Sequence, residues 1–219
     1  IACAAAGIII GVVTKTGVGL RLASGLIDLA GGMLLPAMFF TMITAIVLGM
    51  GVPTTANYVI TSTIAAPALV QMGVPILAAH MFVFYFGIIA DVTPPVALAA
   101  YAGAGISGGD ALKTGVHASK LAVAAFIIPY IFVLSPVILM VDATPLTLIL
   151  ATLSALAGMI AVSSALCGFL ADHCRPYERL LLIIAGLLMI KPGGMTDLVG
   201  CAIFAAILAM QYTRAKKAA

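Results

Sequence analysis

Charged residues are scarce in this chain. Asp, Glu, Lys and Arg together make up 8% of its 219 residues, hydrophobic residues make up 64%, and the mean hydropathy is +1.28. A soluble domain carries about 25% charged and about 45–50% apolar residues. So few charges could not cover a soluble globule of this length, because its exterior would become one continuous apolar patch. The composition therefore predicts an integral membrane protein.

The few charges are also unevenly spaced. None occurs in the 62 residues between Asp28 and Asp91, in the 21 between Lys120 and Asp142, or in the 29 between Asp142 and Asp172. A transmembrane helix needs about 20 apolar residues. These intervals predict an all-α, multi-span helical bundle whose surroundings are the lipid bilayer.

Motifs of several other protein classes are absent. The chain has no Gly-x-x-x-x-Gly-Lys-Ser/Thr loop, so it does not itself hydrolyse ATP. Its net charge of +3 is too small to indicate a nucleic-acid partner. The four cysteines show no CxxC spacing. Cys167 and Cys174 flank His173, but no fourth ligand is evident nearby, so small apolar packing explains them better than zinc.

The two ends of the chain differ in character. Ile1 lies inside an apolar run that has neither the basic region nor the small-residue cleavage site of a signal peptide. We therefore expect Ile1 to fall within a helix of a longer protein. At the other end, Arg214, Lys216 and Lys217 favour a cytoplasmic C-terminus under the positive-inside rule.

Apolar runs and their interruptions divide the chain. The first part is predicted to hold a span ending near Val13, a polar loop at 14–24, helices at 25–48 and 54–70, and apolar segments at 76–90 and 96–104. The second part is predicted to hold a glycine-rich loop at 105–109, a long helix at 110–140 kinked by Pro129 and Pro136, a span at 145–170, and a short helical hairpin at 180–190 and 198–211.

Two interruptions, at 49–53 and 91–95, concentrate polar residues. The apolar runs beside the second hold about 15 and 9 residues, and neither reaches the roughly 20 that a span requires. This pattern predicts a re-entrant helical hairpin, together with a broken helix at the first interruption. Irregular backbone at membrane depth is tolerated where it lines a cavity, and secondary transporters build ion and substrate sites from it.

The first interruption offers neutral oxygen ligands. Gly49 and Gly51 let the backbone leave helical geometry, and Pro53 frees a carbonyl one turn earlier. Thr54, Thr55 and Asn57 add hydroxyl and amide oxygens. This chemistry suits Na⁺ and equally suits an organic substrate. Close helix packing through small residues is the structural alternative.

The second interruption contains an isolated acidic residue, Asp91. An intramembrane carboxylate indicates a cation ligand, a proton carrier or the partner of a basic side chain. Alternatively, Asp91 lies at a hairpin tip near water and caps the next half-helix. Thr93, Pro94 and Pro95 suit a rigid turn at the start of a helix.

Two further residues invite functional interpretations. For His80, a histidine bonded to a backbone carbonyl is favoured over a proton relay. Gly105-Ile106-Ser107-Gly108 matches the GxSG string of intramembrane serine proteases, but His117 and His173 lie near loops and not opposite Ser107 on another span. The chain is therefore not predicted to be an enzyme.

Three stretches resemble the large membrane subunit of tripartite ATP-independent periplasmic (TRAP) transporters: LGMGVPTTANYVI, AAHMFVFYFGIIADVTPPVALAAYAGAGISG and DALKTGVHASKLAVAAFIIPYIFV. The likeness is greatest to permeases in which the small and large subunits are fused. Two stretches near the C-terminus, GFLADHCRPYERLLLIIAGLLMI and MTDLVGCAIFAA, resemble the C-terminal extension of those fused permeases.

The resemblance implies an elevator-type carrier of two inverted repeats in a bacterial or archaeal cytoplasmic membrane. Residues 1–140 would form the second repeat, truncated at its N-terminus, and 141–219 a membrane extension with a short helical hairpin. The expected partners are a periplasmic solute-binding protein and the absent first repeat and small-subunit helices. The expected activity is Na⁺-driven import of organic acids, with no cofactor besides the coupling ion.

The resemblance also assigns residues. Gly49, Gly51, Pro53, Thr54 and Thr55 would border the cation and substrate site, and Asp91, Thr93 and Pro94 would close it from the hairpin. The expected Na⁺ ligands are Gly49, Gly51, Thr54 and Thr93. A channel and a membrane subunit of an ATP-driven importer are the alternative functions.

Overall fold

The computed structural model describes residues 7–8, 11–13, 15–190 and 194–218. Within these ranges the regular structure is helical, apart from one isolated bridge between Phe169 and His173. The predicted all-α fold is therefore confirmed. The chain divides into two compact units, Ile1–Val133 and Leu134–Ala219.

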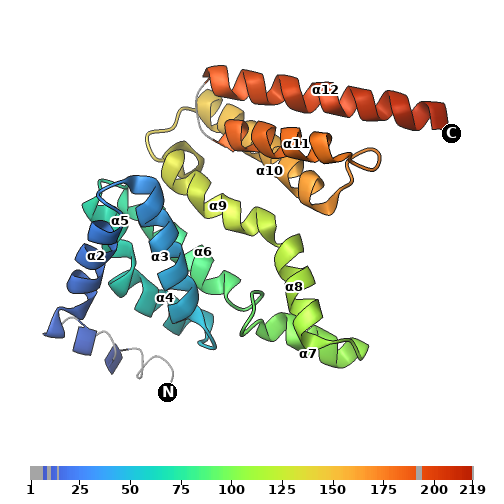
Figure 1. Ribbon diagram of the computed structural model, residues 1–219. Helices are drawn as coiled ribbons and strands as arrows, with labels where there is room; N and C mark the ends of the chain where they lie inside the picture. Colours follow the sequence, from blue (N-terminus) through green and yellow to red (C-terminus); the bar gives the residue numbers. More distant parts are fainter. Residues whose placement is uncertain (1–6, 9–10, 14, 191–193, 219) are drawn as a thin grey trace. The chain divides into compact units, whose positions relative to one another are not determined.

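The first unit contains the helices that surround the two interruptions (Figure 1). They are α2 (Val18–Leu29), α3 (Leu34–Gly49), α4 (Thr54–Ile64), α5 (Ala66–Gln71), α6 (Ile76–Ile89), α7 (Leu98–Ser107), α8 (Ala111–Leu121) and α9 (Val123–Leu134). Helix α6 packs against α3, α4 and α5. On α6, the fully buried rings of Phe82 and Phe86 also meet the ring of Tyr130 on α9, with centroids 5.4 and 5.9 Å apart. This aromatic contact fixes α6 at the centre of the unit.

The second unit is a three-helix layer formed by α10 (Pro145–Cys167), α11 (Pro176–Ile190) and α12 (Gly194–Ala218), preceded by the 3₁₀ turn η1 (Pro136–Leu139). Helices α10, α11 and α12 lie side by side (Figure 1). Glycines allow this close approach. A Cβ at Gly186 would lie 2.7 Å from the carbonyl oxygen of Gly158, and one at Gly200 would lie 2.8 Å from that of Ala185. Small residues at helix contacts are typical of membrane bundles.

Three helical stretches are long and apolar enough to cross a membrane: Ala111–Leu134, Pro145–Cys167 and Met195–Arg214. Large apolar side chains are exposed along them, including Leu146, Leu153 and Leu198. Exposed leucines in such number would be unfavourable in water, and they match a surface that faces lipid. The prediction of an all-α membrane protein holds.

Several predicted boundaries in the first half were wrong. The polar loop expected at 14–24 lies mostly in α2, and the helix expected at 25–48 is divided between α2 and α3. Gly31 and Gly32 cause this division, because both adopt left-handed backbone angles, with φ of 60° and 72°. The helix expected at 54–70 likewise divides, with Pro67 at the start of α5. The span expected to end near Val13 lies partly outside the described residues.

The second half differs from prediction in three places. The helix expected at 110–140 becomes α8, α9 and η1. The division between α9 and η1 falls at Ser135, because proline disfavours the helical conformation of the residue before it. The loop expected at 105–109 is helical as far as Ser107. The hairpin expected at 180–190 and 198–211 is longer, and α12 alone has 25 residues. Its polar ends extend the helix beyond the apolar run that the sequence displays.

Candidate functional site

The first interruption separates α3 from α4. Met50 is extended, with φ −60° and ψ 116°, and Gly51 follows with φ +69°. Pro53 then precedes α4 in an extended conformation, and its carbonyl accepts the backbone N–H of Asn57 at 2.9 Å. The left-handed angle at Gly51 is accessible without strain only to glycine, which explains this residue type at the turn.

The second interruption is a tight connection between α6 and α7. These helices have 14 and 10 residues, so the predicted helix–break–helix pattern around 91–95 is confirmed. The backbone oxygen of Asp91 accepts the N–H of Ala99 at 3.1 Å, which ties the start of the turn to the first turn of α7. The Tyr101 hydroxyl donates to the Pro95 carbonyl at 3.0 Å. These two bonds hold the hairpin tip closed.

The two interruptions meet at a cavity of about 300 Å³ within the first unit. Gly51, Val52, Pro53 and Thr54 line it from the α3–α4 break, and Asp91, Leu98 and Ala99 line it from the α6–α7 hairpin. Residues separated by about 40 positions in the sequence thus line one small cavity. The hydroxyl of Thr54 and the carboxylate of Asp91 are its strongest side-chain ligands for a cation.

The Asp91 carboxylate has no hydrogen bond or ion pair with any residue that the structure describes, and the side chain is half-buried. The Thr54 hydroxyl, which is exposed, likewise makes no side-chain bond within the described ranges. An unpaired carboxylate beside a hydroxyl and irregular backbone is a chemically suitable donor set for a hard monovalent cation.

Four of the predicted site residues line this cavity: Gly51, Pro53, Thr54 and Asp91. The other five lie elsewhere. Thr55 is exposed at the start of α4, and the Thr93 hydroxyl donates to the Ile89 carbonyl at 2.7 Å. Pro94 lines a separate apolar cavity of about 400 Å³ beside α8 and α9. The four expected Na⁺ ligands are therefore not gathered in one cavity, and the Na⁺ assignment stays a prediction.

Gly49 and Asn57 do not line this cavity but form a contact that also includes Gly87. Asn57 is 3% exposed, and its amide fills the space between Gly49 on α3 and Gly87 on α6. A Cβ at Gly87 would lie 2.7 Å from Asn57 Nδ2, and one at Gly49 would lie 2.9 Å from the same atom. Sequence reasoning missed Gly87, because a single glycine inside a smooth apolar run carries no local signal of contact.

The two other candidate residues make ordinary contacts. The Nδ1 atom of His80 is bonded to the Tyr58 hydroxyl at 3.0 Å, and not to a backbone carbonyl as predicted. The Ser107 hydroxyl donates to the Ala104 carbonyl, and the His117 ring is bonded to the carbonyl of Lys113 on its own helix. Ser107 therefore lacks the opposing histidine base that a serine nucleophile requires.

Comparison with known proteins identifies the family. Residues 1–147 match the family model described as "Tripartite ATP-independent periplasmic transporter, DctM component". No curated protein and no solved structure gives a significant match. The match covers more than half of the chain, including both interruptions. It also argues against the ATP-driven importer considered as an alternative, because the family is ATP-independent, and it fits a transporter better than an enzyme. The chain therefore belongs to the DctM family and is a membrane component of a TRAP-type secondary transporter.

Proposed function

We propose that this chain forms part of a Na⁺-coupled importer of organic acids, and that the cavity between the α3–α4 break and the α6–α7 hairpin is part of its coupling-ion site. The observation that carries the proposal is that Asp91 and Thr54, from two non-contiguous segments, line one cavity. A cation bound between these two residues would attract the oxygen atoms of both. Its binding would therefore favour the conformation in which the α3–α4 break and the α6–α7 hairpin lie close together.

Coupling in this proposal is electrostatic. Without a cation, Asp91 is a half-buried carboxylate that lacks a partner among the described residues. Unpaired charge in a membrane protein is costly, and a bound cation removes that cost. If the substrate is itself an anion, the same cation also offsets its charge. Import of an organic acid against its gradient then requires that cation and acid bind the same conformation.

The complete carrier in this proposal has further parts. A periplasmic solute-binding protein would deliver the acid, and a preceding inverted repeat and small-subunit helices would form the rest of the membrane domain. The α6–α7 hairpin would re-enter the bilayer without crossing it, and the site would move as an elevator. The location would be the cytoplasmic (inner) membrane of a bacterium or archaeon.

The test is uptake by proteoliposomes that contain the complete carrier with its binding protein. Labelled small carboxylates are offered under an inward Na⁺ gradient or a matched K⁺ gradient. We expect Na⁺-dependent uptake, and we expect Asp91→Asn to reduce it more than about ten-fold, because a charge-assisted contact contributes about 1.5–3 kcal/mol.

Asp110→Asn is the matched control. Asp110 is an exposed N-cap residue of α8 whose carboxylate accepts the N–H of Lys113 at 2.7 Å. An asparagine caps a helix about as well as an aspartate, so this variant should keep normal uptake. Full Na⁺-dependent uptake by Asp91→Asn would refute the site. Uptake driven by a proton gradient alone would refute the choice of ion.

A further inference from the structure

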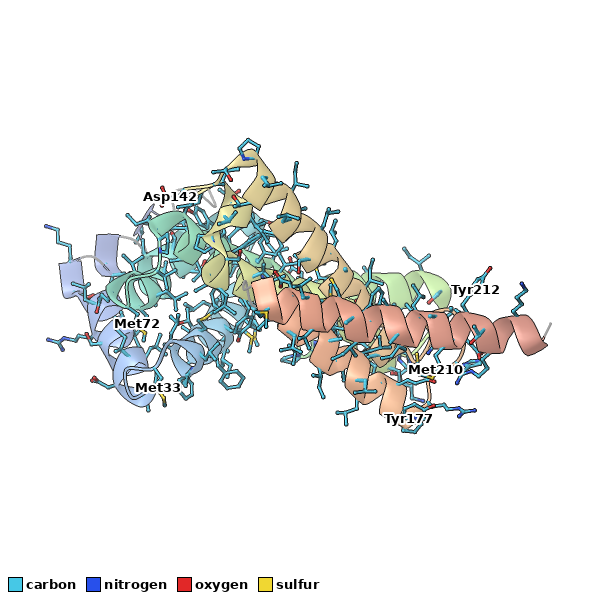
Figure 2. All side chains as sticks on the ribbon, turned by 90° about the horizontal axis from the view of Figure 1, so that it is seen from above. Met33, Met72, Asp142, Tyr177, Met210 and Tyr212 are labelled. Atoms are coloured by element: carbon cyan, nitrogen blue, oxygen red, sulfur yellow. The ribbon has the colours of Figure 1, made fainter. Side chains whose placement is uncertain are left out.

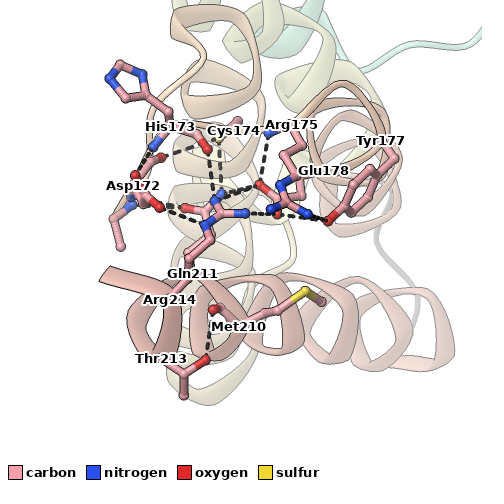
Figure 3. Close-up of polar contacts among 11 residues, drawn as sticks. Asp172, His173, Cys174, Arg175, Tyr177, Glu178, Met210, Gln211, Thr213 and Arg214 are labelled. Atoms are coloured by element: carbon pink, nitrogen blue, oxygen red, sulfur yellow. Dashed lines mark hydrogen bonds and ion pairs between the residues drawn. The ribbon is translucent and has the colours of Figure 1, made fainter. Parts of the chain in front are cut away.

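Another cavity lies in the second unit and shares no residue with the proposed coupling-ion site. It has a volume of about 300 Å³ and is lined by Arg175, Tyr177, Met210, Thr213 and Arg214. Figure 3 shows that these residues come from the start of α11 and the end of α12, around a dense set of hydrogen bonds. Two guanidinium groups in one small cavity indicate an anionic ligand, provided that their charges are not already neutralised.

Arg214 is neutralised by its neighbours. Its Nε atom donates to Asp172 at 2.7 Å, Nη1 donates to Glu178 at 2.9 Å, and Nη2 donates both to Glu178 at 3.3 Å and to the His173 carbonyl at 2.9 Å. Four of its five N–H groups are thus used. The hydrogen bonds from Arg214 also hold the pKa of the Asp172 carboxyl below its usual value, so Asp172 stays charged. Arg214 therefore lines the cavity with its charge already compensated, and it is not the cation available to a ligand.

Arg175 is the uncompensated cation. Its guanidinium makes one side-chain contact within the described ranges, from Nη1 to the Tyr177 hydroxyl at 3.4 Å. Its backbone N–H, by contrast, donates to Glu178 at 3.0 Å, which anchors the residue at the rim. The side chain is exposed, so most of its N–H groups are available to a ligand.

The same end of the unit carries excess positive charge. Asp172 and Glu178 are opposed by Arg175, Arg179 and Arg214 and by the exposed Lys216. The Arg179 guanidinium donates to the carbonyls of Ala165 and Leu166 at the end of α10 and to no acid among the described residues. The local field therefore favours an anion.

The surroundings of the cavity are apolar and aromatic. Tyr177 and Met210, which line the cavity, lie on one side of α12 and are 48% and 49% exposed, whereas Tyr212 lies on the opposite side of the helix (Figure 2). Leu180, one turn after Tyr177 on α11, adds exposed alkyl surface. Tyrosines beside basic residues at the end of an apolar helix are typical of the membrane–water interface. A free inorganic anion would gain nothing from this alkyl rim, whereas a lipid would.

We propose that this cavity binds the phosphate of an anionic phospholipid headgroup, with Arg175 as its donor and the acyl chains lying along α11 and α12. The positively charged C-terminal segment favours the cytoplasmic leaflet, where anionic lipids attract basic residues. The assignment is independent of the coupling ion and of the transported substrate.

The test is native mass spectrometry of the purified full chain in detergent, titrated with phosphatidylglycerol. We expect saturable binding of one lipid that Arg175→Gln weakens about five-fold, since one basic residue contributes about that factor to the binding of anionic lipid. Arg175→Gln retains the backbone bond to Glu178, so an unchanged melting temperature will show that the unit still folds. Lys216→Gln is the matched control, because it also removes one positive charge, from the end of α12 that carries Arg214 but outside the cavity.

Each outcome decides the proposal. Weaker binding by Arg175→Gln with near-normal binding by Lys216→Gln supports the site. An equal loss in both variants would show diffuse attraction and overturn it. Inorganic phosphate or glycerol phosphate that displaces the lipid at millimolar concentration would show that the cavity takes a free phosphate, and would overturn the lipid assignment. Binding of phosphatidylcholine to the parent as tight as that of phosphatidylglycerol would do the same.

Discussion

At the scale of single residues, Asn57 shows how the site is supported. Its amide occupies the gap between Gly49 and Gly87, and its Oδ1 atom has no hydrogen-bond partner among the residues that the structure describes. A buried amide oxygen without a partner costs free energy, so its position must be stabilised by the packing around it. The two glycines provide that packing, because each lets a backbone approach the amide at distances that exclude a Cβ. Asn57, on α4, therefore contacts both α3 and α6.

Replacing Gly87 by alanine tests this contact. The new Cβ would lie 2.7 Å from Asn57 Nδ2 and 2.8 Å from Oδ1, so the amide or α6 must shift. We expect a loss of about 1–3 kcal/mol of stability, as for other overpacked interiors. Thermal unfolding in detergent, followed by far-ultraviolet circular dichroism, measures it.

Gly103→Ala is the control for Gly87→Ala. Gly103 also lies within a helix, α7, but a Cβ there would have no atom within 4 Å. This change should be neutral or slightly stabilising, because alanine favours helix more than glycine does. Equal destabilisation by the two changes would mean that lost glycine flexibility, and not the Asn57 contact, is the cause.

At the scale of elements, the α11–α12 hairpin depends on one ion-pair network. Glu178 is fully buried in the first turn of α11, where its carboxylate accepts hydrogen bonds from Arg214 at 2.9 Å and from Gln211 at 2.8 Å. The Gln211 side chain also receives the backbone N–H of Ala171 at 3.1 Å. One end of α12 is thus bonded both to α11 and to the loop before it.

Removing Arg214 should weaken this hairpin strongly. Arg214→Ala leaves Glu178 as a buried charge without its counter-ion, and we expect a clear loss of stability, because breaking the pair exposes the cost of the remaining charge. The melting temperature of the full chain in detergent measures the loss.

A double variant distinguishes the contribution of the charge pair from that of side-chain packing in this network. Glu178→Gln together with Arg214→Gln removes both charges and keeps a polar amide at each position. It should be more stable than Arg214→Ala, since no fully buried charge remains unpaired, and the partly exposed Asp172 loses its partner in both variants. If the double variant unfolds at the same temperature as the single one, packing and not the charge pair holds the hairpin.

At the scale of the whole molecule, the distribution of charge predicts orientation. Arg214 and Lys216 lie at the end of α12, which contains the candidate span Met195–Arg214. Basic residues next to a span are retained on the cytoplasmic side. We therefore expect a green fluorescent protein fused after Ala219 to be fluorescent and an alkaline phosphatase fused there to be inactive.

A charge-removal variant of the same fusions serves as the control for the orientation experiment. Changing Arg214, Lys216 and Lys217 to glutamine should weaken the preference and lower the ratio of fluorescence to phosphatase activity. An active phosphatase on the unchanged chain would place this end outside the cytoplasm. It would also place the proposed phospholipid cavity in the opposite leaflet.

The sequence by itself determined that this protein lies in a lipid bilayer, and it determined the positions of the two interruptions at 49–53 and 91–95. Scarce charge requires a bilayer whatever the tertiary arrangement, and Gly51, Pro53 and Pro94 act on their own backbone, so their effects are readable locally. The helix breaks at Gly31-Gly32 and at Pro67 also have local causes, but no cluster of polar residues indicated them in the sequence. The helix predicted at 198–211 was shorter than α12, because an apolar run marks only the part of a helix that faces lipid and not its polar ends.

Only the tertiary structure decided which of the marked residues meet. It placed Thr54 and Asp91 at one cavity, turned the Thr93 hydroxyl to the Ile89 carbonyl, and set Asn57 against Gly87. It also brought Arg214 to Glu178 across 36 positions of sequence. The physical reason is that a side chain's direction depends on how each helix is rotated against its neighbours. Nearly uniform apolar sequence leaves that rotation undefined, because lipid and protein interior favour the same residues.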